Sequence, residues 1–237
     1  MLHEEWLSNY QLACRKGCSS CCTQSVTITT LEGEKIIEYL GQQKRLPELD
    51  LIIKNRQIHH TTPPPLTTNE FAEYCLNGIE PQEPINEEWD FTPCPFLNIG
   101  ICTIYPARPF GCRAFVSTIN CDDSGSAEIA PLVLTINTIF TQIIEHLDQN
   151  NLWGKTLDIL AVNKAAYPLN IAKNRDGNSQ NAPEPRLRRA KPMPGLLVSK
   201  NEIKPVETIL KRFFSAEISQ KPSKTCLISI QLSGFNK

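Results

Sequence analysis

Apolar side chains recur every three or four positions in several parts of the chain, which is the spacing of one face of an α-helix. The longest such run starts at Leu132 and ends at Leu147. The spacing predicts helices at 1–13, 31–40, 47–58, 67–76, 132–147, 152–162 and 206–214. Alternating β-branched residues predict a strand at 24–28, and 96–105 has the pattern of a small hairpin. We therefore expect a mostly helical α+β fold.

Capping residues and proline-rich segments predict where these elements begin and end. Thr29 to Glu32 and Thr67 to Glu70 each place threonine three residues before glutamate, the capping-box pattern that opens a helix. Gly41 is expected to end the first of these two helices. The segment 79–93 is expected to be a proline-rich loop, and 172–194 a linker rich in asparagine, proline and arginine.

Charge divides the chain into two parts. The segment 168–237 has 13 Lys/Arg against 5 Asp/Glu, a net charge of +8, whereas 1–167 carries a net charge of −9. We expect 1–167 to form a small, irregular cysteine-rich domain and 168–237 to be a basic linker with a C-terminal helical appendage. The basic run from Arg186 to Lys191 has few aromatic neighbours, which favours a solvated linker over a nucleic-acid site. A protein partner stays open.

The N-terminal sequence and the apolar stretches indicate the compartment. MLHEEWLSNYQLA is acidic and has neither the apolar core nor the cleavage site of a secretory signal. The apolar stretch at 129–140 contains three polar residues and is shorter than the roughly 20 residues that cross a bilayer. We therefore expect a cytoplasmic protein without a membrane span. A reducing cytosol disfavours structural disulfides, so clustered cysteines there more often bind metal or do redox chemistry.

Most of the ten cysteines fall into two groups. The first group, in the run CRKGCSSCC, consists of Cys14, Cys18, Cys21 and Cys22. The second group consists of Cys94, Cys102, Cys112 and, less closely attached, Cys121. Thiolates are soft ligands for zinc and for iron–sulfur clusters, and close spacing lowers the entropy cost of bringing several onto one ion. Cys75 and Cys226 lie apart from both groups and are expected in apolar cores.

The residues around the two groups suit a thiolate site. Gly17 permits a sharp turn inside the first group. Arg15 and Lys16 carry positive charge that offsets the charge of thiolates. In the second group, Arg108 and Arg113 are expected either to cap backbone carbonyls or to pair with thiolates.

Two separated motifs resemble a known family. The CxxxCxxCC run at 14–22 and the later CPFLNIGICTIYPARPFGCR at 94–113 resemble the YkgJ-like cysteine-cluster proteins, which are described as a zinc- or iron-chelating domain. The resemblance covers about 14–121 and implies a metal site rather than a particular reaction. The residues and the resemblance together predict eight metal ligands, which are Cys14, Cys18, Cys21, Cys22, Cys94, Cys102, Cys112 and Cys121.

The metal itself is left open by the sequence. Eight thiolates can hold two zinc ions with four each, or one cubane cluster with four while the rest serve as structural or redox thiols. Cys21 and Cys22 are awkward for one tetrahedral ion, because neighbouring side chains of an extended backbone point apart. The pair is easier to accommodate if its thiols serve different sites, or if one of them is not a ligand. The sequence therefore predicts an iron–sulfur cluster, of the 4Fe–4S type, or zinc, in a structural role that leaves a redox role open.

Other functions remain as alternatives. The spacing of Cys14, Cys18 and Cys21 also occurs in radical S-adenosylmethionine enzymes, but the long alternation of strands and helices around that motif is missing here. The cysteine pattern is similar to that of flagellin lysine N-methylases, which implies a cluster-dependent enzyme as one alternative. A structural-zinc interaction module is another. A thiol–disulfide role for Cys18-Ser19-Ser20-Cys21 lacks the surrounding thioredoxin-like pattern.

Overall fold

The computed structural model describes residues 2–56, 66–80, 91–166 and 186–218. They belong to two compact units, one formed by 8–197 and the other by 1–7 together with 198–237. The secondary structure is mostly helical with a few short strands, which confirms the α+β class. The predicted domain boundary after residue 167 stays a prediction, because 167–185 lies outside the described residues. The predicted end of the helix at 47–58, Ile58, and the predicted core position of Cys226 also fall outside the described residues.

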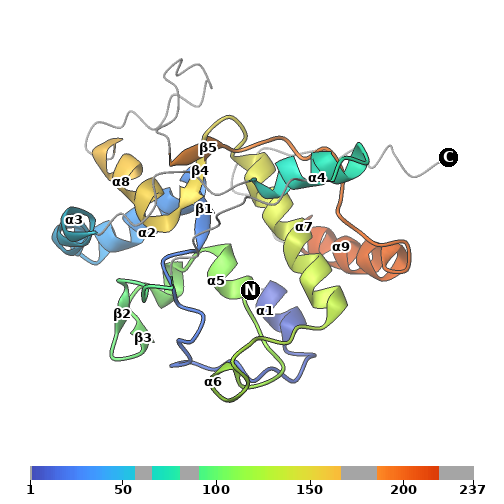
Figure 1. Ribbon diagram of the computed structural model, residues 1–237, viewed down its shortest axis with the longest axis horizontal. Helices are drawn as coiled ribbons and strands as arrows, with labels where there is room; N and C mark the ends of the chain where they lie inside the picture. The colour runs from blue at the N-terminus through green and yellow to red at the C-terminus, as the bar shows by residue number, and fades with distance from the viewer. Residues whose placement is uncertain (1, 57–65, 81–90, 167–185, 219–237) are drawn as a thin grey trace. The chain divides into compact units, whose positions relative to one another are not determined.

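The larger unit contains a small antiparallel sheet in the order β1-β4-β5 (Figure 1). These strands are β1 (Thr27–Thr29), β4 (Leu152–Lys155) and β5 (Leu187–Arg189). Gly154 pairs with Ile28 on one side and with Leu187 on the other. A Cβ on Gly154 would lie 2.5 Å from a Leu187 methyl carbon, so glycine permits this close approach.

Two sequence predictions are wrong at this sheet. The helix predicted at 152–162 begins only at Thr156, because the four residues before it form the central strand. The linker predicted at 172–194 includes β5, whose backbone pairs with β4 instead of lying free in solvent. Both errors arise because a short strand is stabilised by its partners, which lie far away in sequence.

Two helices cover the sheet and build the core. These are α2 (Thr30–Gln42) and α8 (Thr156–Ala166), and α3 (Leu46–Asn55) packs beside them. A Cβ on Gly33 of α2 would lie 2.8 Å from an Ile159 methyl carbon of α8, so the two helix backbones approach closely. The buried cluster consists of Ile28, Ile36, Ile37, Leu40, Leu49, Phe96, Ile104, Leu157, Ile159, Leu160 and Leu187, with Cys94 and Cys102 packed against it.

Both predicted capping boxes are confirmed. Thr29 and Glu32 exchange hydrogen bonds at the start of α2, and Thr67 and Glu70 do the same at the start of α4 (Thr68–Leu76). The predicted stop at Gly41 is wrong, since α2 continues through it to Gln42. The chain turns instead at Lys44, whose φ is +57°.

A buried polar network joins α4 to the long helix α7 (Pro131–Leu147), which was predicted at 132–147. Glu145 is buried, and its two carboxylate oxygens accept hydrogen bonds from the backbone N–H groups of Asn69 and Lys191, each at 2.9 Å. Because every carboxylate oxygen has a donor, the network fastens α4 and the segment after β5 to α7.

Replacing Glu145 with glutamine is expected to change how stability depends on pH. Burial raises the pKa of the Glu145 carboxyl, and hydrogen bonds oppose the rise. A carboxyl whose pKa is raised in the folded state adds to the free energy of unfolding. This contribution is fully present below the glutamate pKa in the unfolded chain, about 4.3, and is lost as pH rises through the pKa in the folded state. In urea unfolding, the stability advantage of the wild type over Glu145→Gln should therefore shrink from about pH 4 towards neutrality. An advantage that grows with pH would contradict this.

The smaller unit pairs α1 (Leu2–Leu7) with α9 (Ile203–Ile218). The predicted helices at 1–13 and 206–214 are thus present with different ends. Trp6 and Phe213 are buried and meet edge to face, with ring centroids 6.3 Å apart. None of the helices in the described ranges is both long enough and apolar enough to span a bilayer.

Candidate metal centre

The first cysteine group lies in a loop of successive tight turns rather than in a helix or strand. The backbone N–H of Cys18 donates to the Arg15 carbonyl at 3.0 Å, and that of Cys22 donates to the Ser19 carbonyl at 2.9 Å. Gly17 has a φ of +92°, in the left-handed region that favours glycine. The turns fold the segment back on itself, so its four thiols are held within one short loop.

Alanine at position 17 is expected to lower the free energy of unfolding by about 1 kcal/mol. A Cβ on Gly17 would meet no atom within 4 Å, so the positive φ is the source of the strain. Ser19→Ala is the matched control, because Ser19 lies in the same loop without a positive φ. Urea unfolding measures both variants, and a Gly17→Ala protein as stable as the wild type would contradict the turn described above.

The second group begins on a hairpin that is joined directly to the first group. The backbone N–H of Cys94 donates to the carbonyl of Cys22 at 2.8 Å. The hairpin consists of β2 (Leu97–Asn98) and β3 (Ile101–Cys102), with Leu97 opposite Cys102. Ile99 and Gly100 both have positive φ, as a two-residue type I′ turn requires. The predicted hairpin is therefore confirmed, and it places Cys94 and Cys102 beside the buried core.

Cys112 lies on the short helix α5 (Phe110–Ala114), which follows the 3-10 turn η1 (Tyr105–Ala107). The N-terminus of α5 is fixed by Glu32, whose Oε1 accepts the Phe110 N–H at 2.8 Å while Oε2 accepts the Thr29 N–H at 3.0 Å. The sequence revealed only the second of these bonds, through the capping box. The first was not readable, because it joins residues 78 positions apart.

The two arginines of this segment lie differently. Arg113 donates from Nε to the Arg108 carbonyl at 3.0 Å and from Nη2 to the Pro106 carbonyl at 2.9 Å. It therefore caps backbone carbonyls, which was one of the two roles expected for it. The guanidinium carbon of Arg108 lies 4.0 Å from the centroid of the Tyr105 ring. Arg108 also lines the cysteine pocket, and its positive charge opposes the rise in the pKa of the Cys21 and Cys112 thiols.

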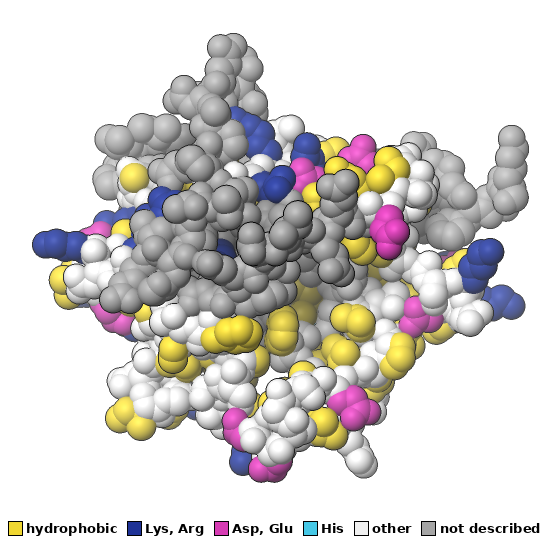
Figure 2. Space-filling model, viewed as in Figure 1, with side chains coloured by type: hydrophobic (Ala, Val, Ile, Leu, Met, Phe, Trp, Pro, Cys, Tyr) yellow, Lys and Arg dark blue, Asp and Glu magenta, His cyan; other side chains and the backbone are white. Residues whose placement is uncertain are grey.

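Cys121 lies on α6 (Cys121–Ser124), a single helical turn. The hydroxyl of Ser20 donates to the Asp122 carboxylate at 2.6 Å. The Ser117 N–H donates to the Cys14 sulfur at 3.2 Å. Acidic side chains stand out over α6 at the lower edge of Figure 2, in agreement with two aspartates in that helix.

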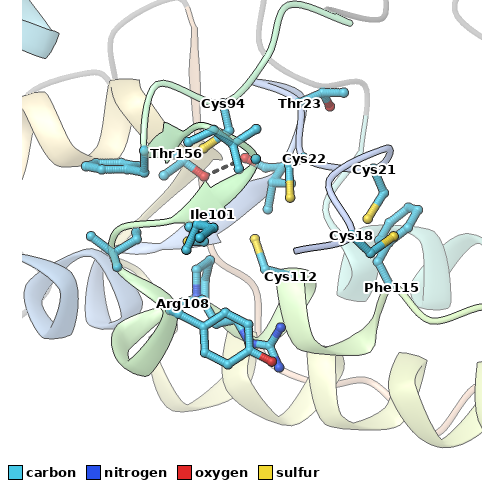
Figure 3. A pocket seen from close by; sticks show the side chains of 18 of the residues that line it. Cys18, Cys21, Cys22, Thr23, Cys94, Ile101, Arg108, Cys112, Phe115 and Thr156 are labelled. Carbon is cyan, nitrogen blue, oxygen red and sulfur yellow. Dashed lines mark hydrogen bonds between the residues drawn. The ribbon is translucent and has the colours of Figure 1, made fainter. Parts of the chain in front are cut away.

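One pocket brings together most of the predicted ligands (Figure 3). Its volume is about 110 Å³, and seven of the eight cysteines line it, namely Cys14, Cys18, Cys21, Cys22, Cys94, Cys102 and Cys112. Cys121 is not among the lining residues. Cys75 is exposed on α4, so its predicted place in a core is wrong. The cysteines in the described part of the chain are all free thiols.

The thiols in the pocket influence one another's protonation. Burial raises the pKa of the Cys112 thiol to about 12, and the neighbouring charges of Cys94 and Cys102 add to the rise. A side-chain hydrogen bond between Cys21 and Cys22 raises the pKa of the Cys21 thiol and lowers that of Cys22. Several thiolates in one pocket repel each other, and a bound cation removes that repulsion while displacing the protons.

The donor set fits zinc or iron by its chemistry, because both take thiolate sulfur. Within the described residues, no three His, Cys, Asp or Glu side chains stand close enough together to hold a metal ion as they are. Binding would therefore require the thiols to come closer together. The ligand role of the eight cysteines stays a prediction.

Comparison with known proteins identifies the family. The comparison with curated proteins found no match, and neither did the comparison with solved structures. The family model that matches covers residues 13–131, half of the chain, including all eight predicted ligands. The chain belongs to this family, CxxCxxCC, described as a "putative zinc- or iron-chelating domain".

Proposed function

We propose that this protein binds zinc or an iron–sulfur cluster through the thiolates of its two cysteine groups. The observation that supports this most is the shared pocket. Its cysteines come from 14–22 and from 94–112, yet seven of them face one space of about 110 Å³. Thiols from two distant segments that line one pocket are suited to a shared metal site, and membership of the family already indicates zinc or iron chelation.

The first role of the metal would be to cross-link the N-terminal loop to the hairpin and α5. Ligands that come together only in the folded chain make the free energy of metal binding part of the free energy of folding. The protein's own residues prepare the site, because Cys94 is hydrogen-bonded to Cys22 and Glu32 fixes the start of α5. An iron–sulfur cluster, of the 4Fe–4S type, would in addition carry electrons.

Elemental analysis tests this proposal. The full chain should be purified without oxygen and without metal-affinity resin, and then analysed for iron, zinc and acid-labile sulfide. Iron with an equal amount of sulfide would support a cluster, and zinc without iron would support a structural site. A chain that carries neither metal, and that takes up neither after reduction and reconstitution, would overturn the proposal.

A further inference from the structure

We propose that the eight cysteines form two adjacent four-thiolate metal centres, divided between the neighbouring residues Cys21 and Cys22. The inference rests on the proposed function and extends it by assigning each thiol to a centre. The core centre consists of Cys22, Cys94, Cys102 and Cys112. The peripheral centre consists of Cys14, Cys18, Cys21 and Cys121.

Backbone contacts gather three ligands of the core centre. The Cys94 N–H donates to the Cys22 carbonyl at 2.8 Å, and the Leu97 N–H donates to the Cys94 carbonyl at 3.0 Å. Leu97 in turn lies opposite Cys102 in the hairpin. Backbone hydrogen bonds thus connect Cys22 to Cys94 and Cys94 to Leu97, and strand pairing connects Leu97 to Cys102. Cys94 and Cys102 also pack against the buried cluster.

Cys112 completes the core centre from α5. The charges of Cys94 and Cys102 act on its thiol, followed by the charge of Cys21, and the thiol of Cys22 is influenced by the charges of Cys112, Cys94 and Cys102. Figure 3 shows the sulfurs of Cys22 and Cys112 pointing towards one another from the loop and from α5. The core centre therefore joins both cysteine groups of the sequence.

A separate set of contacts brings Cys121 to the first loop. The Ala13 N–H donates to the Ser117 carbonyl at 2.8 Å, and the Ser117 N–H donates to the Cys14 sulfur at 3.2 Å. On the other side, the Ser20 hydroxyl donates to Asp122 at 2.6 Å. These links lie on both sides of Cys121 and hold its segment against the loop at 14–21.

The thiols of the loop complete the peripheral centre. The charges that act on the Cys14 thiol, after burial and its bond to Ser117, are those of Cys18, Cys21 and Cys121. Cys18 and Cys21 lie together beside Phe115 on one side of the pocket in Figure 3. Cys21 and Cys22 are neighbours in the chain, so the two centres meet between them.

This division accounts for the neighbouring cysteines Cys21 and Cys22, and it predicts two centres of unequal zinc affinity. Each of the two neighbouring thiols serves a different ion, so neither tetrahedral site needs both. The core centre takes three of its four ligands from a hairpin on the core and from a helix fixed by Glu32, whereas the peripheral centre takes all of its ligands from a loop and a four-residue helix. Zinc should therefore fill the core centre first.

Zinc counting in matched variants tests the division. The full chain is made metal-free with chelator and reductant under anaerobic conditions, titrated with Zn²⁺, freed of unbound ion and analysed. Wild type and the control Cys75→Ser should hold two zinc ions per chain. Cys18→Ser with Cys121→Ser should hold one, and Cys94→Ser with Cys112→Ser should also hold one. Titration with Co²⁺ should show sulfur-to-cobalt charge-transfer absorption halved in both pairs.

The outcomes separate this inference from the proposed function. One zinc per wild-type chain would overturn the two centres and leave thiolate binding intact. Two zincs or none in the Cys18/Cys121 pair would overturn the division itself. The Cys18/Cys121 double variant tests the division even if the Cys94/Cys112 double variant fails to fold. Neither Cys18 nor Cys121 belongs to the buried cluster or packs against it, so their replacement should leave the core intact. No zinc or cobalt in the wild type would contradict the proposed function as well.

Discussion

Replacing Cys21 and Cys112 with serine in one chain should remove nearly all bound metal and most of the stability. The two residues belong to different cysteine segments, so the double variant loses a thiolate from each. Binding of structural zinc supplies about 10–16 kcal/mol in small zinc-dependent peptides at pH 7. That is comparable with the whole stability of a typical domain, about 5–15 kcal/mol. Metal content and the thermal unfolding midpoint should therefore fall together.

Cys75→Ser is the control for this experiment. Cys75 is an exposed free thiol on α4 and does not line the cysteine pocket. Its replacement removes a thiol without removing a predicted ligand, so metal content and midpoint should both equal those of the wild type. A soluble Cys21/Cys112 variant with the wild-type metal content would count decisively against the ligand assignment.

Glu32→Ala should destabilise the fold by about 2–4 kcal/mol and also weaken metal binding. The carboxylate accepts the N–H groups of Thr29 and Phe110, and a partly buried donor left without its acceptor costs about 1–3 kcal/mol. Phe110 begins the helix that carries Cys112. Loss of its bond should therefore release that ligand, which a metal titration of the folded variant would show as a raised Kd.

Glu70→Ala separates the two effects of Glu32. Glu70 has the same capping-box role at the start of α4, and no bond joins it to α5. We expect this variant to lose stability through its helix cap while keeping the wild-type metal affinity. Equal metal affinities in the Glu32→Ala and Glu70→Ala proteins would contradict the positioning role of Glu32.

Local sequence patterns predicted those parts of the fold that depend on near neighbours. The boxes at Thr29 and Thr67 opened helices where expected, because their hydrogen bonds span only three residues. The hairpin after Cys94 formed for a similar reason, since its two-residue turn has glycine at one of two positions that need positive φ. The long apolar periodicity of α7 was also sufficient to locate that helix to within one residue at its start.

Long-range pairing could not be predicted from the same patterns. Leu152–Lys155 continues into α8 and resembled the start of a helix, but its backbone is paired on both sides by strands from distant segments. The bond from Glu32 to Phe110 and the bond from Ser20 to Asp122 likewise depend on how the chain folds back. The cysteine spacing thus suggested two groups by sequence position, whereas in the folded chain seven of these cysteines line one pocket.

X-ray absorption spectroscopy of the metal in the purified full chain tests the central claim most directly, because it counts the atoms bound to that metal. We predict about four sulfur neighbours per metal at about 2.3 Å, whether the metal is zinc or cluster iron. A nearest shell made of nitrogen and oxygen, with no sulfur, would contradict a thiolate centre built from these cysteines.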